Sequence, residues 1–149
     1  MVRVRQAEAI AGRGLAGDRY AAAAGSFSRW PGRGRAITLI AAEALREAEA
    51  AHDVAFADGS HRRNLVVEGV PLEDFRGVPF QIGAASFEGV RICAPCKYLI
   101  RVTGQPAAFD ALVGRGGLRA AITTGGVIQE GDAVTWDPEA VTRRRRLPG

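Results

Sequence analysis

The stretch GRGGLRAAITTGGVIQEGDAVTW, residues 114–136, contains the clearest signals of fold class in the chain. Three short runs of apolar and β-branched residues are separated by Gly-Gly and by Glu-Gly-Asp. Glycine pairs and Gly-Asp steps are typical of tight turns, because glycine adopts the positive φ angles that such turns need. The stretch therefore predicts three short strands joined by turns.

The remaining sequence adds further short strands and two helices. Strands are predicted at residues 37–40 and 62–67, and a hairpin is predicted where VPFQIG and ASFEGVRI alternate apolar with polar residues. The run AAEALREAEAAH, residues 41–52, consists of strong helix formers, and residues 106–113 predict a shorter helix with Pro106 in its first turn. Many short strands with few helices indicate an α+β fold that is mostly β, a small antiparallel β-barrel with helical decoration.

Length and composition indicate one globular domain. The chain has 149 residues, of which 47% are hydrophobic and 24% charged. No apolar run approaches the roughly 20 residues that cross a bilayer, and MVRVRQAEAI lacks the apolar core of a signal peptide. We expect a cytoplasmic protein without membrane association, with a single domain at residues 1–137 and a basic C-terminal tail at 138–149.

The positive charge of the chain comes from that tail. Four of the 20 basic residues form the run at residues 143–146, and the other 16 equal the 16 acidic residues in number. The body shows no stripe of basic residues interleaved with aromatic ones, so no nucleic-acid partner is expected. Regular βαβ alternation, a GxGxxG turn and a Walker sequence are all missing, which argues against a Rossmann or P-loop nucleotide enzyme.

Both cysteines of the chain lie in ICAPCKYL, residues 92–99. A close CxxC pair in a reducing compartment is more often redox-active or metal-bound than structural. Zinc is disfavoured because His52 and His61 lack a recognised ligand spacing. Three interpretations stay open: a dithiol pair, a single reactive thiolate beside Lys97, and two buried cysteines that act as small apolar residues.

Arginine and glycine residues elsewhere suggest a site for an anion. Arg62 and Asn64 begin a predicted strand, Asp18-Arg19 follows a glycine, and Arg115-Gly116 begins the glycine-rich stretch. Guanidinium groups pair bidentately with phosphate, and N–H groups beside glycine bind the same ligands. If these segments meet, they would hold a small ligand that carries a phosphate and a heterocycle.

Five segments together resemble a known family. They are GRGLAGDRY, GRAITLIAAEAL, RRNLVVEGVPL, FRGVPFQIGAASFEGVRICAPC and GRGGLRAAITTGGVIQEGDAV. Their order resembles that of the short, free-standing bacterial members of the MOSC family, which is named for the C-terminal domain of molybdenum-cofactor sulfurase. The resemblance covers residues 12–136.

This resemblance implies a MOSC-type β-barrel with a cleft for the molybdopterin type of molybdenum cofactor. It implies that Cys96 is the thiolate ligand of the metal or, in a sulfur carrier, the site of a persulfide. It also implies that Arg62, Asn64 and Arg19 contact the cofactor, to which the residues themselves add Arg115 and Gly116. Asp18 is the nearest carboxylate in these motifs for a proton relay.

Three functions follow from the resemblance. The first is a reductase of N-hydroxylated or N-oxide small molecules. An external electron-transfer protein would supply its electrons, because the chain lacks the electron-transfer domains of larger relatives. The second is a sulfurtransferase that receives sulfur from a donor, with Cys96 as persulfide carrier and Cys93 as resolving thiol. The third is a module that binds cofactor without catalysis.

Overall fold

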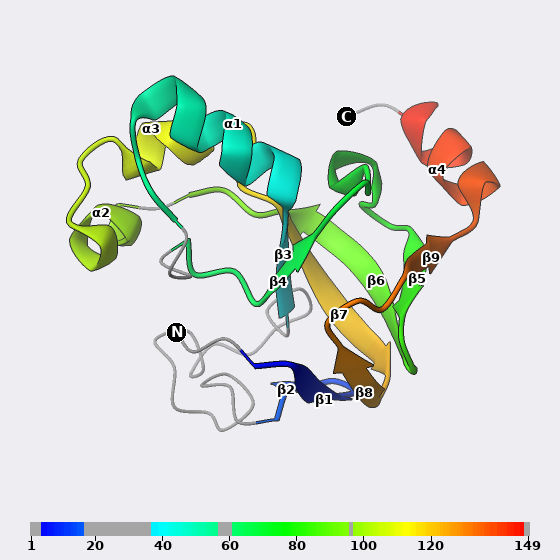
Figure 1. The fold of residues 1–149 in the computed structure, drawn as a ribbon. Coiled ribbons are helices and arrows are strands. Elements are labelled where there is room, and N and C mark those ends of the chain that lie inside the picture. The colour runs from blue at the N-terminus through cyan, green and yellow to red at the C-terminus, as the bar shows by residue number, and fades with distance from the viewer. Residues whose placement is uncertain (1–3, 17–36, 57–60, 96, 148–149) are drawn as a thin grey trace.

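The computed structural model describes residues 4–16, 37–56, 61–95 and 97–147. Within these ranges the strands form a six-stranded sheet in the order β4-β3-β7-β6-β5-β9 and a three-stranded sheet in the order β2-β1-β8. Figure 1 shows the larger sheet curling above the smaller one, with α1, α2 and α3 gathered on one side and α4 on the other. No helix in the described ranges is both long and apolar enough to span a membrane.

The chain passes between the two sheets most directly after β7. The chain leaves β7, in the larger sheet, and enters β8, in the smaller sheet, after the single residue Gly125. The larger sheet contains β3 (Ile37–Ala41), β4 (Leu65–Val67), β5 (Pro79–Ile82), β6 (Ala85–Ile92), β7 (Leu118–Thr124) and β9 (Val134–Trp136). The smaller sheet contains β1 (Gln6–Ile10), β2 (Gly14–Leu15) and β8 (Gly126–Gln129).

Local sequence explains the strand geometry. In β7 the side chains of Leu118, Ala120 and Ile122 are buried, and the residues between them are more exposed, as the period of two in a strand requires. The described strand pairs are antiparallel except for β3 and β4, which are parallel. A parallel pair needs a long crossover connection, and α1 (Ala42–His52) supplies it.

The main core lies inside the curled sheet. Aromatic rings pack at its centre: Phe75 lies 5.2 Å from Phe80 and 5.2 Å from Trp136, and Phe80 stacks on Phe87 at 5.3 Å between ring centroids. Phe75 follows the short 3₁₀ helix η1 (Leu72–Asp74), whose Leu72 is also buried. Burial of each such side chain stabilises the fold by roughly 1.5–3 kcal/mol.

A second core lies on the outer face of β3. It forms where Ile40 meets α1, α2 (Tyr98–Thr103) and α3 (Ala108–Leu112). The helix α1 ends at Asp53, whose left-handed backbone (φ 52°) closes the last turn. The buried residues of this core are Ile40, Ala48, Val54, Phe56, Leu99, Ala108, Ala111 and Leu112. These helices therefore cover the outer side of the sheet around the end of β3.

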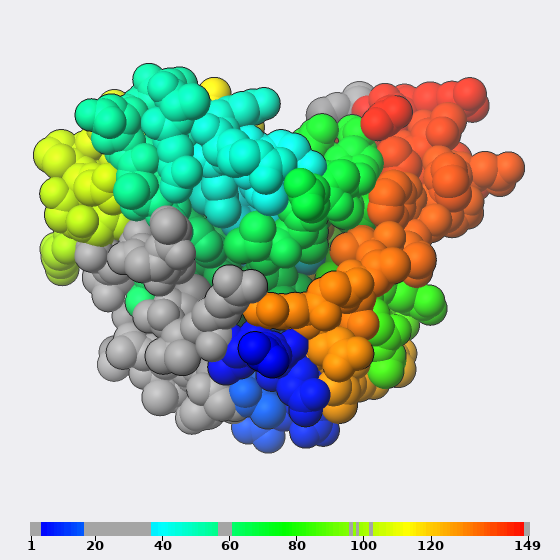
Figure 2. Space-filling view, viewed as in Figure 1, coloured from blue at the N-terminus to red at the C-terminus, as the bar shows by residue number. Residues whose placement is uncertain are grey.

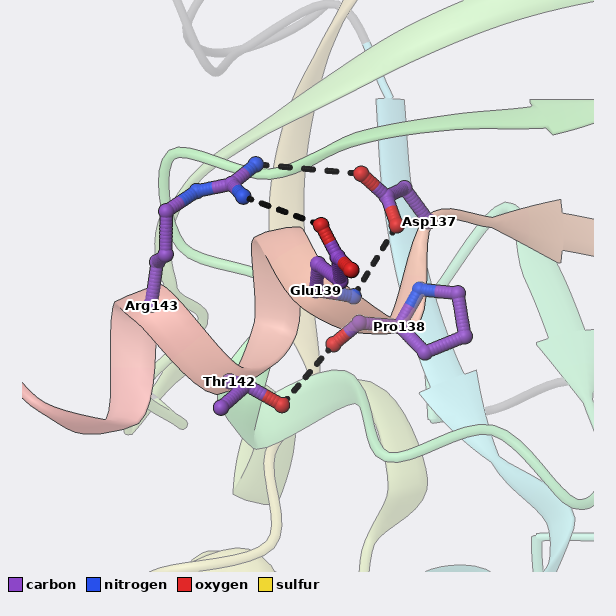
Figure 3. Close-up of polar contacts among 5 residues, drawn as sticks. All are labelled: Asp137, Pro138, Glu139, Thr142 and Arg143. Carbon is purple, nitrogen blue, oxygen red and sulfur yellow. Dashed lines mark hydrogen bonds and ion pairs between the residues drawn. The ribbon is translucent and has the colours of Figure 1, made fainter.

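The C-terminal segment forms the helix α4 (Pro138–Arg145). Asp137 caps its start by accepting a hydrogen bond from the Glu139 N–H at 2.9 Å, and Arg143 forms ion pairs with both carboxylates (Figure 3). Val141 is buried in the main core, although Figure 2 shows the end of the helix projecting from the body. The boundary at residue 137 stays a prediction.

The predicted fold class is confirmed. The described chain is mostly β with the helices α1 to α4, and its larger sheet curls into a half-barrel. The predicted strand at residues 37–40, the helix at 41–52 and the hairpin of β5 and β6 all appear. The three strands expected in residues 114–136 are β7, β8 and β9.

Candidate functional site

Three connecting segments meet at one end of the larger sheet. Residues 61–64 lead into β4, residues 114–117 lead into β7, and Cys93 follows the end of β6. The Nε of Arg63 donates to the carbonyl oxygen of Gly116 at 2.8 Å, and the Cys93 N–H donates to that of Gly117 at 2.8 Å. The structure thus brings together the predicted segments around Arg62 and Gly116 and the first cysteine of the CxxC pair.

Arg63 holds this junction together from the inside. Its side chain is buried, and its Nη1 donates to the carbonyl oxygen of His61 at 3.0 Å, while its own N–H donates to Nδ1 of His61 at 3.0 Å. Hydrogen bonds from a charged donor are worth about 1.5–3 kcal/mol each. Arg63 therefore has a structural role, which the sequence did not distinguish from that of its neighbour.

Arg62 differs from Arg63 in backbone conformation, in burial and in hydrogen bonding. Its backbone is left-handed, with φ at 64°, a conformation that costs a non-glycine residue about 1–2 kcal/mol. Its side chain is half-buried, and its guanidinium makes no hydrogen bond or ion pair with any residue in the described ranges. Strained residues with spare donors are typical of binding sites.

Asn64 fastens the same loop to β3. Its Oδ1 accepts hydrogen bonds from the N–H of Thr38 at 2.9 Å and from the Thr38 hydroxyl at 3.0 Å, and its own N–H donates to that hydroxyl at 3.1 Å. The side-chain amide of Asn64 therefore anchors the end of the loop that contains Arg62 to β3. Sequence reasoning did not identify Thr38, which lies 26 positions away.

Gly116 and Gly117 allow neighbouring segments of the backbone to approach each other closely. A Cβ on Gly116 would lie 2.0 Å from the carbonyl oxygen of Cys93, and one on Gly117 would lie 1.9 Å from that of Leu39. Arg115 is half-buried, and its Nη1 lies 3.4 Å from the carbonyl oxygen of Ala111, in its own preceding helix. Gly116 thus belongs to the junction itself, and Arg115 lies beside it.

The described part of the cysteine pair is Cys93, whose side chain is 2% exposed. A thiol this deeply buried has poor access for thiol–disulfide exchange, which disfavours a resolving role. Cys96, Asp18 and Arg19 lie outside the described residues, so their roles stay predictions.

His61 is the other buried polar residue of the site. Its ring lies 6.5 Å from that of Phe56 in an edge-on arrangement, next to the second core. Among the residues that the structure describes, no group of three or more His, Cys, Asp or Glu side chains is arranged to hold a metal ion. No pattern in the sequence indicates the packing role of His61, because nothing local distinguishes a buried histidine from an exposed one.

An open groove of about 810 Å³ lies elsewhere, between α4 and the segments 76–79 and 88–90 at the start of β5 and in β6. Arg76, Glu88, Arg143 and Arg144 are among the residues that line it, and none of the predicted site residues does. The groove is therefore separate from the junction of the three segments.

Comparison with known proteins agrees with the fold described above. A family model of the MOSC domain matches residues 26–135. The YuaD protein from Bacillus subtilis superimposes with a TM-score of 0.72 at 19% identity, over 88% of this chain and 84% of that one. YiiM from Escherichia coli has a TM-score of 0.68 at 18% identity, over 99% of this chain and 74% of that one.

YiiM from Geobacillus stearothermophilus has a TM-score of 0.63 at 23% identity, over 71% of this chain and 56% of that one. At such identities the solved structures show the shared fold alone. No curated protein matches the chain.

Proposed function

This chain belongs to the MOSC domain family, a family linked to molybdenum cofactor binding, and we propose that it binds a molybdopterin-type molybdenum cofactor at the junction of its three segments. The convergence of residues 61–64, residues 114–117 and the end of β6 supports this proposal most strongly. In the sequence these segments are separate motifs, whereas a cofactor site needs them close together.

The chemistry of the donors fits an anionic organic group. Arg62 presents a half-buried guanidinium that has no partner in the described ranges, on a backbone held by Asn64 and Thr38. Guanidinium is a fork of N–H donors that matches phosphate oxygens in geometry and in charge. Arg62 is therefore the described residue best placed to hold the phosphate of the cofactor.

The remaining roles follow the family resemblance. Cys96 would bind the metal through its thiolate, and Arg19 would contact the phosphate or the pterin together with Arg62. Asp18 would relay a proton or hold Arg19 in place. Gly116 would support the site indirectly, since its missing side chain lets the backbone of Cys93 lie against residues 114–117.

The reaction that we propose is the reduction of N-hydroxylated or N-oxide compounds. When bound, the cofactor would supply oxygen-atom transfer, and the protein would supply binding, orientation and electrostatics. Loss of oxygen from such a substrate consumes electrons and protons and releases water. The electrons would come from a separate electron-transfer protein.

The test uses full-length protein made in a host that synthesises molybdenum cofactor. We expect molybdenum and pterin to co-purify with the wild type, and both to fall at least about tenfold in Arg62→Gly, because a charge-assisted hydrogen bond is worth about 1.5–3 kcal/mol. Glycine suits the left-handed backbone, so the loop itself should stay folded. Asp53→Gly is the matched control, since Asp53 also has a positive φ but caps α1.

Cys96→Ser separates the reductase from a sulfur carrier. Loss of molybdenum in this variant supports the role as metal ligand. Protein without molybdenum, whose intact mass carries one extra sulfur that reductant removes and Cys96→Ser abolishes, would instead support the sulfurtransferase. Full retention of metal and pterin in both Arg62→Gly and Cys96→Ser contradicts the proposed site.

A further inference from the structure

The end of β6 contains an irregularity that changes which face a side chain occupies. Gly89 is paired with Ala120, but the next paired residue of β6, Arg91, is opposite Arg119, so Val90 is an extra residue in the strand. Strict alternation would have placed Arg91 on the core face, together with Gly89. A β-bulge shifts the later residues to the other face, and here it directs Arg91 outward.

The bulge places two arginines directly opposite each other. Arg119 is half-buried, Arg91 is exposed, and both belong to the outer face of the sheet. Directly opposite residues have Cβ atoms about 4.5–5.5 Å apart, and like charges in such a pair are destabilising. Neither guanidinium makes a hydrogen bond or ion pair with any residue in the part of the chain that the structure describes.

Glu88 is the carboxylate on the same face of β6. It is opposite Ala121, two pairs along the strands from the two arginines, with the Gly89–Ala120 pair between them. Among the described residues, no ion pair joins Arg91 or Arg119 to a carboxylate. Within that part of the chain, the repulsion between the two arginines is thus not neutralised by an ion pair.

The arginine pair adjoins the junction described above. On its other side, Arg119 is opposite Thr38, whose hydroxyl and N–H bind Asn64. Arg91, Arg119, Thr38 and Asn64 therefore form a continuous polar row across three neighbouring strands, β6, β7 and β3, and the segment that leads into β4. Along β6, Arg91 is two residues from Cys93.

We propose that Arg91 and Arg119 form a binding site for an oxyanion, such as a phosphate group with two negative charges. Two guanidinium forks on adjacent strands can bind such a group from two sides, and the anion would cancel the repulsion between them. Two sources share this chemistry: the phosphate of a bound cofactor and an oxyanion of a separate small molecule. The site does not depend on the proposed function, because phosphate alone should occupy it.

Thermal unfolding of cofactor-free protein in inorganic phosphate tests the site. Sodium chloride keeps the ionic strength constant, so general screening does not contribute. We expect phosphate to raise the Tm of the wild type by about 3–6 °C at roughly ten times its Kd. In Arg91→Gln and in Arg119→Gln, calorimetric titration should show phosphate affinity lowered about tenfold or more, and in the double variant the Tm shift should disappear.

Arg146→Gln is the matched control, because it removes an exposed arginine at the end of α4 and should keep the full phosphate response. Without phosphate, Arg119→Gln should unfold at the same or a higher temperature than the wild type, since it removes the repulsion. The proposal is overturned if phosphate does not shift the wild-type Tm or shifts that of the double variant equally. It is also overturned if Arg119→Gln strongly lowers the Tm in phosphate-free buffer.

Cofactor-loaded protein distinguishes the two sources of the oxyanion. If the phosphate of the cofactor fills the site, the loaded protein no longer responds to added phosphate, and the double variant retains less pterin. If a separate anion fills it, the loaded protein still responds and pterin retention is unchanged. Protein that never acquires cofactor would contradict the proposed function while leaving the phosphate titration valid.

Discussion

Arg62 and Arg63 are neighbours in the sequence, but their guanidinium groups make different contacts. The guanidinium of Arg63 is buried and bonded to the carbonyl oxygens of Gly116 and His61, so it stabilises the junction. The guanidinium of Arg62 makes no such bond to the described residues, and its backbone is left-handed. Loss of Arg63 would leave buried acceptors unsatisfied, whereas loss of Arg62 breaks no hydrogen bond within the described part of the chain.

At this scale Gly117 offers a stability test. Gly117→Ala should lower the free energy of unfolding by about 3 kcal/mol or more, because its Cβ would meet the carbonyl oxygen of Leu39 and only a shift of β3 could relieve the clash. Gly114→Ala, in the same loop at φ 76°, meets nothing within 4 Å and should cost only about 1–2 kcal/mol. Urea unfolding measures both, and equal losses would refute the close approach.

Among the elements, α1 connects the strands that support the site. It leaves β3 after Ala41 and returns the chain so that β4 pairs in parallel. Glu43, in its first turn, accepts a hydrogen bond from the N–H of Gly69 at 2.7 Å, just beyond β4. That bond is the main reason why the pKa of Glu43 lies below its ordinary value of 4.5.

This carboxylate predicts a small pH dependence of stability. A lowered pKa in the folded state means that the ionised form of Glu43 stabilises the fold above pH 4.5. That stability is lost as pH falls through the folded pKa. We expect Glu43→Gln to lower the Tm at neutral pH and the difference from the wild type to vanish in acid. Thermal scans across pH measure it, with Glu47→Gln on the same helix as control, and a difference that persists in acid would contradict the role.

For the whole molecule, β3 separates two cores. Its Ile37 and Leu39 face the interior of the curled sheet, and its Ile40 faces the helices α1, α2 and α3. The junction of the candidate site lies where these two cores meet, at the edge of both. The opposite end of the main core is covered by α4, through Val141.

The contribution of α4 can be measured by truncation. Removal of residues 138–149 should lower the free energy of unfolding by roughly 2 kcal/mol, because it exposes the surface that Val141 covers and removes the contact of Arg145 with Asp74. That contact also raises the pKa of Arg145. Removal of residues 146–149 alone should change stability by less than about 0.5 kcal/mol. Equal stability of both truncated chains would instead support a separable tail.

The sequence by itself determined the fold class and most elements, because strand alternation, helix propensity and glycine turns are properties of neighbouring residues. It also identified the segments around Arg62, Arg115 and the cysteines as separate candidates. Its predictions for Asp18, Arg19 and Cys96 lie outside the described residues and stay predictions.

Only the tertiary structure decided that these segments meet, and which of their side chains are used in packing. The bond from Arg63 to Gly116 joins residues 53 positions apart, and the register of β6 against β7 directs Arg91 to the outer face. The first depends on the order of the strands, and the second depends on one extra residue in β6. Neither leaves a local pattern in the sequence, since the free energy that selects them comes from contacts between distant parts of the chain.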